Sequence, residues 1–356
     1  MTNYEHGADI YSTAKKFNID EDKILDFSSN INPLGIPKSI KKAYLKSLEV
    51  CHRYPDSKLR KLSQKIGDYE KVSKDWIFIS NGASEGIYRT VLSLKPKKAL
   101  LTAPSFGEYE ESLEILDTNI SYYYLKEDNN FDLNEDFLNL INNDIDILFI
   151  CNPNNPTGRI TKKGLIQSII EKSYNCGTYV VIDESFLDFL PNKTNLSIVD
   201  FIKSYPNLIV LKSFTKIYSI PGIRLGYCIC SNIDLIKSIK KNGPPWNISA
   251  AAETCGIAAL MEDRYISKSI SYIRSQRKYL VKELRNLGFK VYKSEVNYIL
   301  FKIDKNINLK ELLEKNHILI RSCSNYKGLN KDFYRIAVKN KEDNDILIDK
   351  LKEIIK

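Results

Sequence analysis

Residues 213–226 read Ser213-Phe214-Thr215-Lys216-Ile217-Tyr218-Ser219-Ile220-Pro221-Gly222-Ile223-Arg224-Leu225-Gly226. The segment follows an apolar run at 208–212 whose β-branched residues predict a buried strand. A lysine just beyond such a strand can form a Schiff base if burial and neighbouring cations lower its pKa. The hydroxyls of Ser213 and Thr215 and the guanidinium of Arg224 can hold a phosphate. The segment therefore predicts a nucleophilic lysine beside an anion site.

Similar short apolar runs recur upstream of this segment. We expect strands at 76–80, 99–102, 145–150, 179–183 and 208–212, and a helix at 83–94 after the first strand. Fully apolar runs of this length suit a sheet that is buried on both faces, with helices between its strands. The sequence therefore predicts an α/β fold with a mostly parallel sheet.

The C-terminal part has a different pattern. Residues 250–287 are helical in pattern, with a break near Asp263, and the tail mixes strands at 298–301 and 334–338 with helices at 309–315 and 341–355. We predict a large domain at 46–265 and a smaller α+β domain at 266–356. The N-terminal segment, 1–45, lacks strong periodicity and is expected to pack on the smaller domain.

Composition narrows the class of protein. Of the 356 residues, 43% are hydrophobic, which excludes a disordered chain. No apolar run approaches the ~18 residues that cross a bilayer and no signal peptide is visible, so we expect a soluble cytoplasmic protein without a membrane partner. Seven scattered cysteines and three histidines predict neither disulfides nor a metal site. The net charge of +9 is spread over lysine pairs, which favours small anionic substrates over nucleic acid.

Three other predicted strands also end in polar segments. The first runs into a turn of small residues, 81–86, that can bind a phosphate or be a tight turn only. The strand at 145–150 runs into 151–158, where prolines can hold the Asn155 amide toward a ligand or stiffen a surface loop. Asp183 ends another strand and needs a partner, either a ligand or a salt bridge or helix cap. Ligands of open α/β sheets bind at the carboxyl ends of strands, where these residues would meet.

Together these residues resemble one family. Segment 213–226 is similar, position by position, to the lysine site of class I/II aminotransferases of fold type I, which use pyridoxal 5′-phosphate (PLP). The resemblance covers nearly the whole chain and implies a PLP transferase fold, with a large, mostly parallel domain and a smaller α+β domain. It also implies that catalytic Lys216 bonds to the cofactor and that Asp183 pairs with the protonated pyridine nitrogen.

The same resemblance assigns the remaining cofactor contacts. Asn155 would bond the 3-oxygen of the cofactor ring, and Phe106 would stack on that ring. The cofactor phosphate would be held by Ala83, Ser84, Ser213, Thr215 and Arg224. Tyr54 matches the tyrosine that this family contributes to the phosphate across a dimer interface, which implies a homodimer with shared active sites. Phe186 stands where many relatives have a tyrosine, so the pKa of the lysine–cofactor link is expected to differ from theirs.

Flanking residues distinguish two subfamilies. His6-Gly7 and segments 26–35, 244–246 and 320–329 resemble threonine-phosphate decarboxylases of cobalamin biosynthesis. Arg335 matches the family arginine that binds the substrate α-carboxylate, and a guanidinium can do so through two parallel hydrogen bonds. The residues that resemble the set binding the substrate's phosphate are Arg321, His6 and Asn32. The resemblance implies decarboxylation of O-phospho-L-threonine to (R)-1-amino-2-propanol phosphate.

Alternatives remain open on sequence alone. Histidinol-phosphate aminotransferases share the lysine site, and substrate orientation, which a sequence does not specify, decides between loss of CO₂ and amino transfer. The two tail arginines can also be surface ion pairs. A PLP-binding protein without enzymatic activity is a third reading, and the presence of Lys216, Asp183, Asn155 and Arg224 argues against it.

Overall fold

Seven strands form the large sheet within residues 7–355, the part of the chain that this computed structural model describes. Their order is β2-β8-β7-β6-β5-β3-β4, and β8 runs antiparallel to both of its neighbours while the other pairs are parallel. The strands are β2 (Ile77–Ser80), β3 (Lys98–Ala103), β4 (Asn119–Tyr124), β5 (Ile147–Cys151), β6 (Tyr179–Asp183), β7 (Leu208–Ser213) and β8 (Gly226–Ile229). The predicted α/β fold with a mostly parallel sheet is confirmed.

The central strands are buried on both faces because their side chains alternate between two hydrophobic cores. In β5, Leu148 lies in one core and Phe149 in the other, and in β6 Val180 and Val181 divide in the same way. Helices α3 and α6 close the first core, and α4, α5 and α8 close the second. These helices and the short α7 are α3 (Arg60–Glu70), α4 (Gly82–Leu94), α5 (Glu108–Glu114), α6 (Lys163–Cys176), α7 (Lys193–Leu196) and α8 (Ile233–Lys241).

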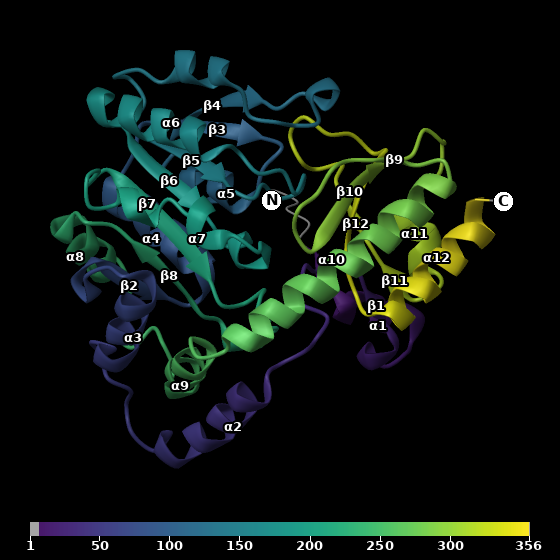
Figure 1. Ribbon diagram of the computed structural model, residues 1–356, viewed down its shortest axis with the longest axis horizontal. Helices are drawn as coiled ribbons and strands as arrows, with labels where there is room; N and C mark the ends of the chain where they lie inside the picture. Colours follow the sequence, from purple (N-terminus) through teal and green to yellow (C-terminus); the bar gives the residue numbers. More distant parts are fainter. Residues whose placement is uncertain (1–6, 356) are drawn as a thin grey trace.

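A second, antiparallel sheet lies beside the first, and the long helix α10 (Asp263–Asn286) runs between the two in Figure 1. Its strand order is β12-β13-β10-β9. The strands and the helices that follow in this region are β9 (Lys290–Val291), β10 (Tyr298–Lys302), β12 (Arg321–Ser322), β13 (Phe333–Ala337), α11 (Leu309–Glu314) and α12 (Lys341–Ile355).

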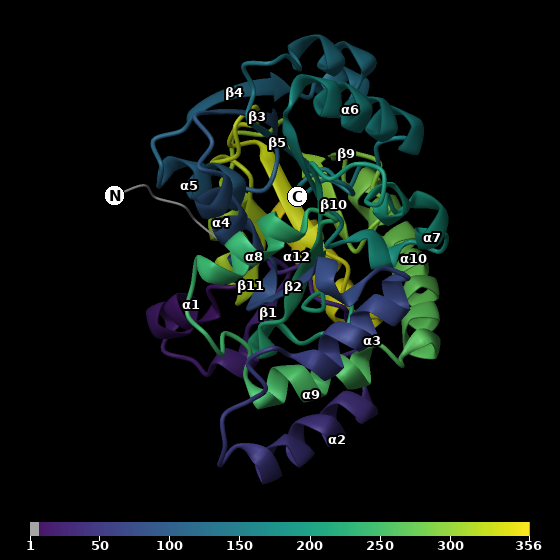
Figure 2. The same ribbon diagram turned by 90° about the vertical axis from the view of Figure 1, so that its left-hand side faces the viewer.

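The N-terminal part of the chain packs against two different parts of the molecule. Strand β1 (Leu25–Asp26) pairs in parallel with β11 (Ile318–Leu319), and α1 (Ile10–Phe17) donates a hydrogen bond from Thr13 to Glu314 at 3.2 Å. Helix α2 (Lys38–Ser47) instead lies along α9 (Ala250–Ala259), at the bottom of Figures 1 and 2. The domain limits drawn from the sequence stay a prediction.

Short 3₁₀ turns connect many of these elements. They occupy Glu21–Lys23, Leu48–Val50, Lys74–Trp76, Glu127–Asn129, Glu135–Leu140, Leu187–Phe189, Val199–Phe201 and Pro221–Ile223. None of the helices in the described range has the length and apolar character that crossing a bilayer demands.

Candidate active site

A cavity of about 320 Å³ opens where β3, β5, β6 and β7 end. This volume falls in the ~300–1,000 Å³ range of small-molecule sites. Strands β12 and β13 of the second sheet supply another part of the wall. Most of the residues that the sequence singled out line this one cavity: Ala83, Ser84, Phe106, Asn155, Asp183, Ser213, Thr215, Lys216, Arg224, Arg321 and Arg335.

Lys216 lies in the cavity wall just beyond β7. Burial, together with the positive charges of Arg224 and Arg335, lowers the pKa of its ammonium group from 10.5 to about 8. The carboxylates of Glu108 and Asp183 oppose this shift. A lysine with such a pKa has an appreciable neutral fraction near pH 7, so its amine can act as a nucleophile or as a base.

The end of the cavity beside α4 is built to receive an anion. Gly82 begins α4 with a φ of +76°, and a Cβ there would approach the Nη2 of Arg224 to 2.3 Å. Glycine therefore lets the guanidinium of Arg224 lie directly against the start of the helix. A helix N-terminus presents free backbone N–H groups and a partial positive charge. Ser213 and Thr215 line the same cavity and add hydroxyl donors.

Asp183 ends β6 and is 4% exposed. The hydroxyl of Tyr109 donates to its Oδ2 at 2.7 Å, and the backbone N–H of Ser185 donates to its Oδ1 at 2.8 Å. These two donors fix the orientation of the Asp183 carboxyl group, which lines the cavity.

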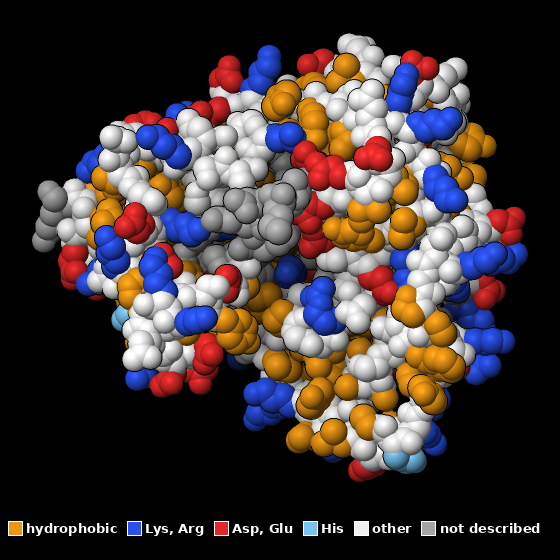
Figure 3. Space-filling model, turned by 180° about the vertical axis from the view of Figure 1, so that it is seen from behind, with side chains coloured by type: hydrophobic (Ala, Val, Ile, Leu, Met, Phe, Trp, Pro, Cys, Tyr) orange, Lys and Arg blue, Asp and Glu red, His pale blue; other side chains and the backbone are white. Residues whose placement is uncertain are grey.

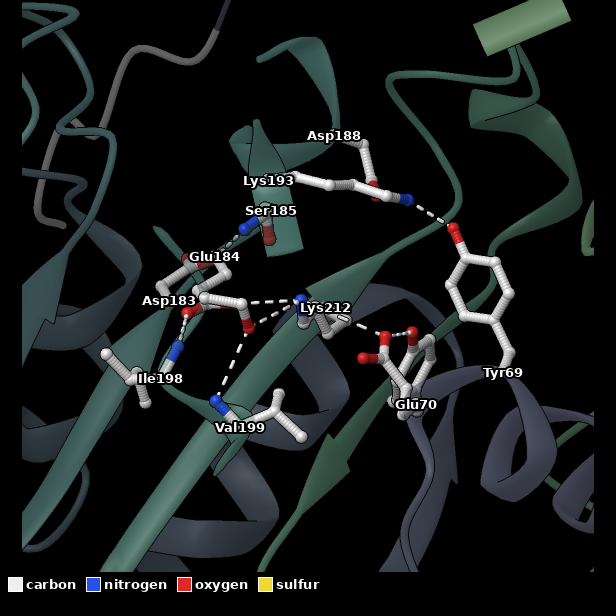
Figure 4. Close-up of polar contacts among 12 residues, drawn as sticks. Tyr69, Glu70, Asp183, Glu184, Ser185, Asp188, Lys193, Ile198, Val199 and Lys212 are labelled. Atoms are coloured by element: carbon white, nitrogen blue, oxygen red, sulfur yellow. Dashed lines mark hydrogen bonds and ion pairs between the residues drawn. The ribbon is translucent and has the colours of Figure 1, made fainter. Parts of the chain in front are cut away.

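Glu184, the residue that follows Asp183, forms a buried ion pair. Lys212, on β7, lies 2.6 Å from the Oε2 of Glu184, which is completely buried and also accepts hydrogen bonds from the backbone of Ile198 and the hydroxyl of Ser197. Figure 4 shows Lys212 between Glu184 and Glu70, with Asp183 beside Glu184. These contacts tie the ends of β6 and β7, which carry Asp183 and Ser213, to each other.

Asn155 and Phe106 lie on loops that reach the cavity from β5 and β3. The Oδ1 of Asn155 accepts a hydrogen bond from the Nη1 of Arg335, so its amide Nδ2 is left to donate to a ligand. Phe106 contacts Tyr109 edge to face, with ring centroids 5.6 Å apart. Phe186 lines the cavity without a hydroxyl and packs against Tyr298.

Arg321 and Arg335 are direct cross-strand partners on β12 and β13. Both side chains are buried, at 6% and 5% exposure, and both line the cavity. The Nη2 of Arg335 donates to the backbone oxygen of Ser28, whereas its buried Nε has no hydrogen-bond partner among the described residues. Like charges directly opposite one another on a sheet are destabilising, so this arrangement favours anions bound between them.

Two sequence-derived site residues within the described part of the chain are not found in the cavity wall. Tyr54 is 80% exposed and packs on Trp246, with ring centroids 4.8 Å apart. Asn32 is buried, but its Nδ2 donates to the carbonyl of Ile217 and the hydroxyl of Ser269, so it acts within the fold. His6 lies outside the described residues.

The structure adds cavity residues that sequence reasoning missed. Asn30, two residues before Asn32, is on the wall. Lys327 pairs with Glu110 at 3.1 Å across the cavity from α5. Tyr109 is fully buried on α5, and nothing in the sequence pattern pointed to its role.

The donor set fits the chemistry of PLP. A lysine of lowered pKa suits the aldehyde, the helix N-terminus with Arg224 suits the phosphate, and the carboxylate of Asp183 suits a protonated pyridine nitrogen. This site at the end of a mostly parallel sheet defines the class of PLP-dependent enzymes of fold type I.

Comparisons with known proteins agree with this class. Residues 22–351 match the family model of aminotransferase class I and II. Over 357 residues the chain is 34% identical to the threonine-phosphate decarboxylase of Salmonella typhimurium, covering 100% of this chain and 98% of the relative.

Two solved structures are also similar. The histidinol-phosphate aminotransferase of Clostridium acetobutylicum has a TM-score of 0.87 at 34% sequence identity. The L-threonine-O-3-phosphate decarboxylase of Porphyromonas gingivalis has a TM-score of 0.81 at 25% sequence identity. Each match covers 93% of this chain and 99% of the chain of the solved structure. The chain belongs to the aminotransferase class I and II family, and it is a PLP-dependent enzyme.

Proposed function

We propose that this protein decarboxylates O-phospho-L-threonine to (R)-1-amino-2-propanol phosphate and CO₂, as a step of corrinoid biosynthesis. The observation that carries the proposal is the buried cross-strand pair of Arg321 and Arg335 in the wall that also holds Lys216. A phosphorylated amino acid brings two anionic groups, and two neighbouring guanidinium groups can bind both. The whole-length similarity to a threonine-phosphate decarboxylase supports the same substrate.

The cofactor would be held by residues on three sides of the cavity. Its phosphate would lie at the α4 end, and Asp183, Asn155 and Phe106 would contact its ring. The phosphate contacts would come from Ala83, Ser84, Ser213, Thr215 and Arg224. When bound, PLP supplies an electron sink that stabilises the charge left when a bond to the substrate's α-carbon breaks.

The substrate would lie between Lys216 and the two arginines. Arg335, already oriented by Asn155 and Ser28, would bind the α-carboxylate, and Arg321 would bind the phosphate. Two anchor points fix the orientation of the α-carbon, and orientation selects the bond that breaks. Loss of CO₂ leaves a pair of electrons at the α-carbon that must accept a proton. The ammonium form of Lys216 is the group in the cavity suited to deliver that proton, which leaves the neutral amine.

We further propose that the active enzyme is a homodimer in which Tyr54 reaches the partner's cofactor phosphate. Tyr54 is exposed on its own chain and packs on Trp246, and Figure 3 shows hydrophobic side chains gathered over the lower part of the molecule. Other exposed apolar side chains, on and just after α2, are Tyr44, Leu45 and Leu48. Contiguous apolar surface of this kind marks an interface. The cytoplasmic location expected from the sequence is part of this proposal.

A second candidate is histidinol-phosphate aminotransferase activity, because a solved enzyme of that name is also 34% identical. Product analysis with O-phospho-L-threonine, with and without 2-oxoglutarate, separates the two. A decarboxylase forms aminopropanol phosphate at the same rate under both conditions. Dependence of turnover on 2-oxoglutarate, with loss of the amino group from the substrate, would instead identify an aminotransferase.

A further inference from the structure

Tyr109 is the one residue from a distant element that donates a hydrogen bond to the Asp183 side chain within residues 7–355. The other donor, Ser185, is two residues further along the same chain segment. Tyr109 is 1% exposed and stacks on Phe149 of β5, with ring centroids 5.0 Å apart. Its hydroxyl is therefore fixed against Asp183 by the packing of its ring.

We propose that Tyr109 is a positioning residue that holds the Asp183 carboxylate oriented toward the ring nitrogen of the cofactor. The inference rests on the proposed role of Asp183. Phe106, which would stack on the ring, lies three residues before Tyr109. One short segment at the start of α5 thereby sets both the ring plane and the carboxylate beside its nitrogen.

The surroundings of Tyr109 keep its hydroxyl protonated, so it donates its hydrogen bond to Asp183 at all working pH values. Burial, and then the charge of Asp183, raise the pKa of Tyr109 well above its usual value. The titratable groups that face Asp183 from other elements are Cys151 on β5, Tyr298 on β10 and Lys216 beyond β7. Burial also raises the pKa of Cys151 and of Tyr298, so both stay protonated.

Removing the Tyr109 hydroxyl is expected to change how well the protein stabilises charge on the cofactor ring. Without the Tyr109 donor, the Asp183 carboxylate is held less firmly in place and stabilises a positive charge on the ring nitrogen less well. A less positive ring withdraws fewer electrons from the nitrogen through which Lys216 attaches, so the pKa of that nitrogen rises. The same loss weakens the electron sink and slows the chemical step.

The test is the pH titration of the visible absorbance of the PLP-loaded enzyme, which requires no substrate. Tyr109→Phe, which keeps the ring, is expected to move the titration midpoint upward by about half a pH unit or more. It is also expected to lower kcat about tenfold with little change in KM. Tyr227→Phe is the matched control, because this buried tyrosine also donates its hydroxyl to a carboxylate, Glu70, outside the cavity.

A second comparison protects the test against a general disturbance of the fold. In an Asp183→Asn background, Tyr109→Phe is expected to shift the midpoint no further, because the hydroxyl acts through the carboxylate. An unchanged midpoint in Tyr109→Phe, an equal shift in Tyr227→Phe, or an additive shift in the double variant would each overturn the inference. The titration gives the same answer whether the enzyme decarboxylates or transfers amino groups, so the proposed function can fail separately.

Discussion

At the scale of single residues, the site concentrates positive charge. Lys216, Arg224 and Arg335 share one cavity, and the guanidinium groups contribute to the low pKa of the lysine. In the protein without cofactor and substrate this repulsion opposes folding. The anions that the cavity is built to bind would offset it.

The pKa of Lys216 predicts a pH-dependent stability difference. Its folded-state pKa is about 8, below its ordinary 10.5, so between these values the unfolded chain binds more protons and stability rises with pH. Below pH 8 the penalty is complete. Lys216→Met should therefore raise the free energy of unfolding of the cofactor-free protein by roughly 1–3 kcal/mol at pH 7, a figure reduced because the side chain is partly exposed.

Urea denaturation at several pH values measures this effect. The advantage of Lys216→Met over the wild type should shrink progressively between pH 8 and 10.5. An advantage of the same size at pH 7 and pH 10 would show that the charge of Lys216 is not its cause.

At the scale of elements, the phosphate site proposed at the start of α4 requires glycine as its first residue. Gly82→Ala would force Arg224 away from the helix N-terminus, because the new Cβ would lie 2.3 Å from Nη2. We expect the dissociation constant of PLP to rise about tenfold or more, measured by equilibrium titration. Gly164→Ala is the control, since a Cβ there meets no atom within 4 Å. Equal cofactor affinity in the two variants would contradict this account of the turn.

Removing one partner of the buried ion pair at the ends of β6 and β7 should strongly destabilise the fold. Lys212→Met leaves the carboxylate of Glu184 buried without its cation, which typically costs ~3–5 kcal/mol. The exposed pair of Lys237 and Asp234 offers a comparison, and Lys237→Met should cost under ~1 kcal/mol. Chemical denaturation measures both. A loss in Lys212→Met no larger than in Lys237→Met would refute a structural role for the buried pair.

Sequence patterns predicted the elements whose burial is uniform and missed those whose burial is mixed. The apolar runs of β5, β6 and β7 match strands that are buried on both faces. Strand β4 was not predicted, because it lies at the sheet edge, has half-exposed tyrosines and lacks an apolar run. The short β8 begins with Gly226 inside the lysine-site motif, so its strand character depends on its two neighbours in the sheet.

The same limit applies to the site. Asn155, Asp183 and Lys216 could be placed from sequence because each lies at or shortly after the end of a buried strand, and such ends meet at one edge. A sequence motif does not show which way a side chain points. The side chain of Asn32 is hydrogen-bonded inside the fold, whereas Asn30 reaches the cavity. The role of Tyr109 depends on the packing of α5, which brings its hydroxyl to Asp183, 74 residues away in the sequence.

At the scale of the whole molecule, the exposed position of Tyr54 predicts shared active sites. Lys216→Ala and Tyr54→Ala proteins should each be nearly inactive alone. Mixed dimers contain one site with Lys216 from one chain and Tyr54 from the other. An equimolar mixture, unfolded and refolded together, should therefore recover about a quarter of wild-type activity per site. Activity no higher than the average of the separate variants would exclude a site completed by the partner.

The central claim is that this cavity removes CO₂ from a phosphorylated amino acid. The most direct measurement is CO₂ release from O-phospho-L-threonine by the PLP-loaded enzyme without any keto acid. We expect many turnovers, with one aminopropanol phosphate formed for each CO₂. Absence of CO₂, together with rapid amino transfer from histidinol phosphate to 2-oxoglutarate, would contradict the decarboxylase assignment.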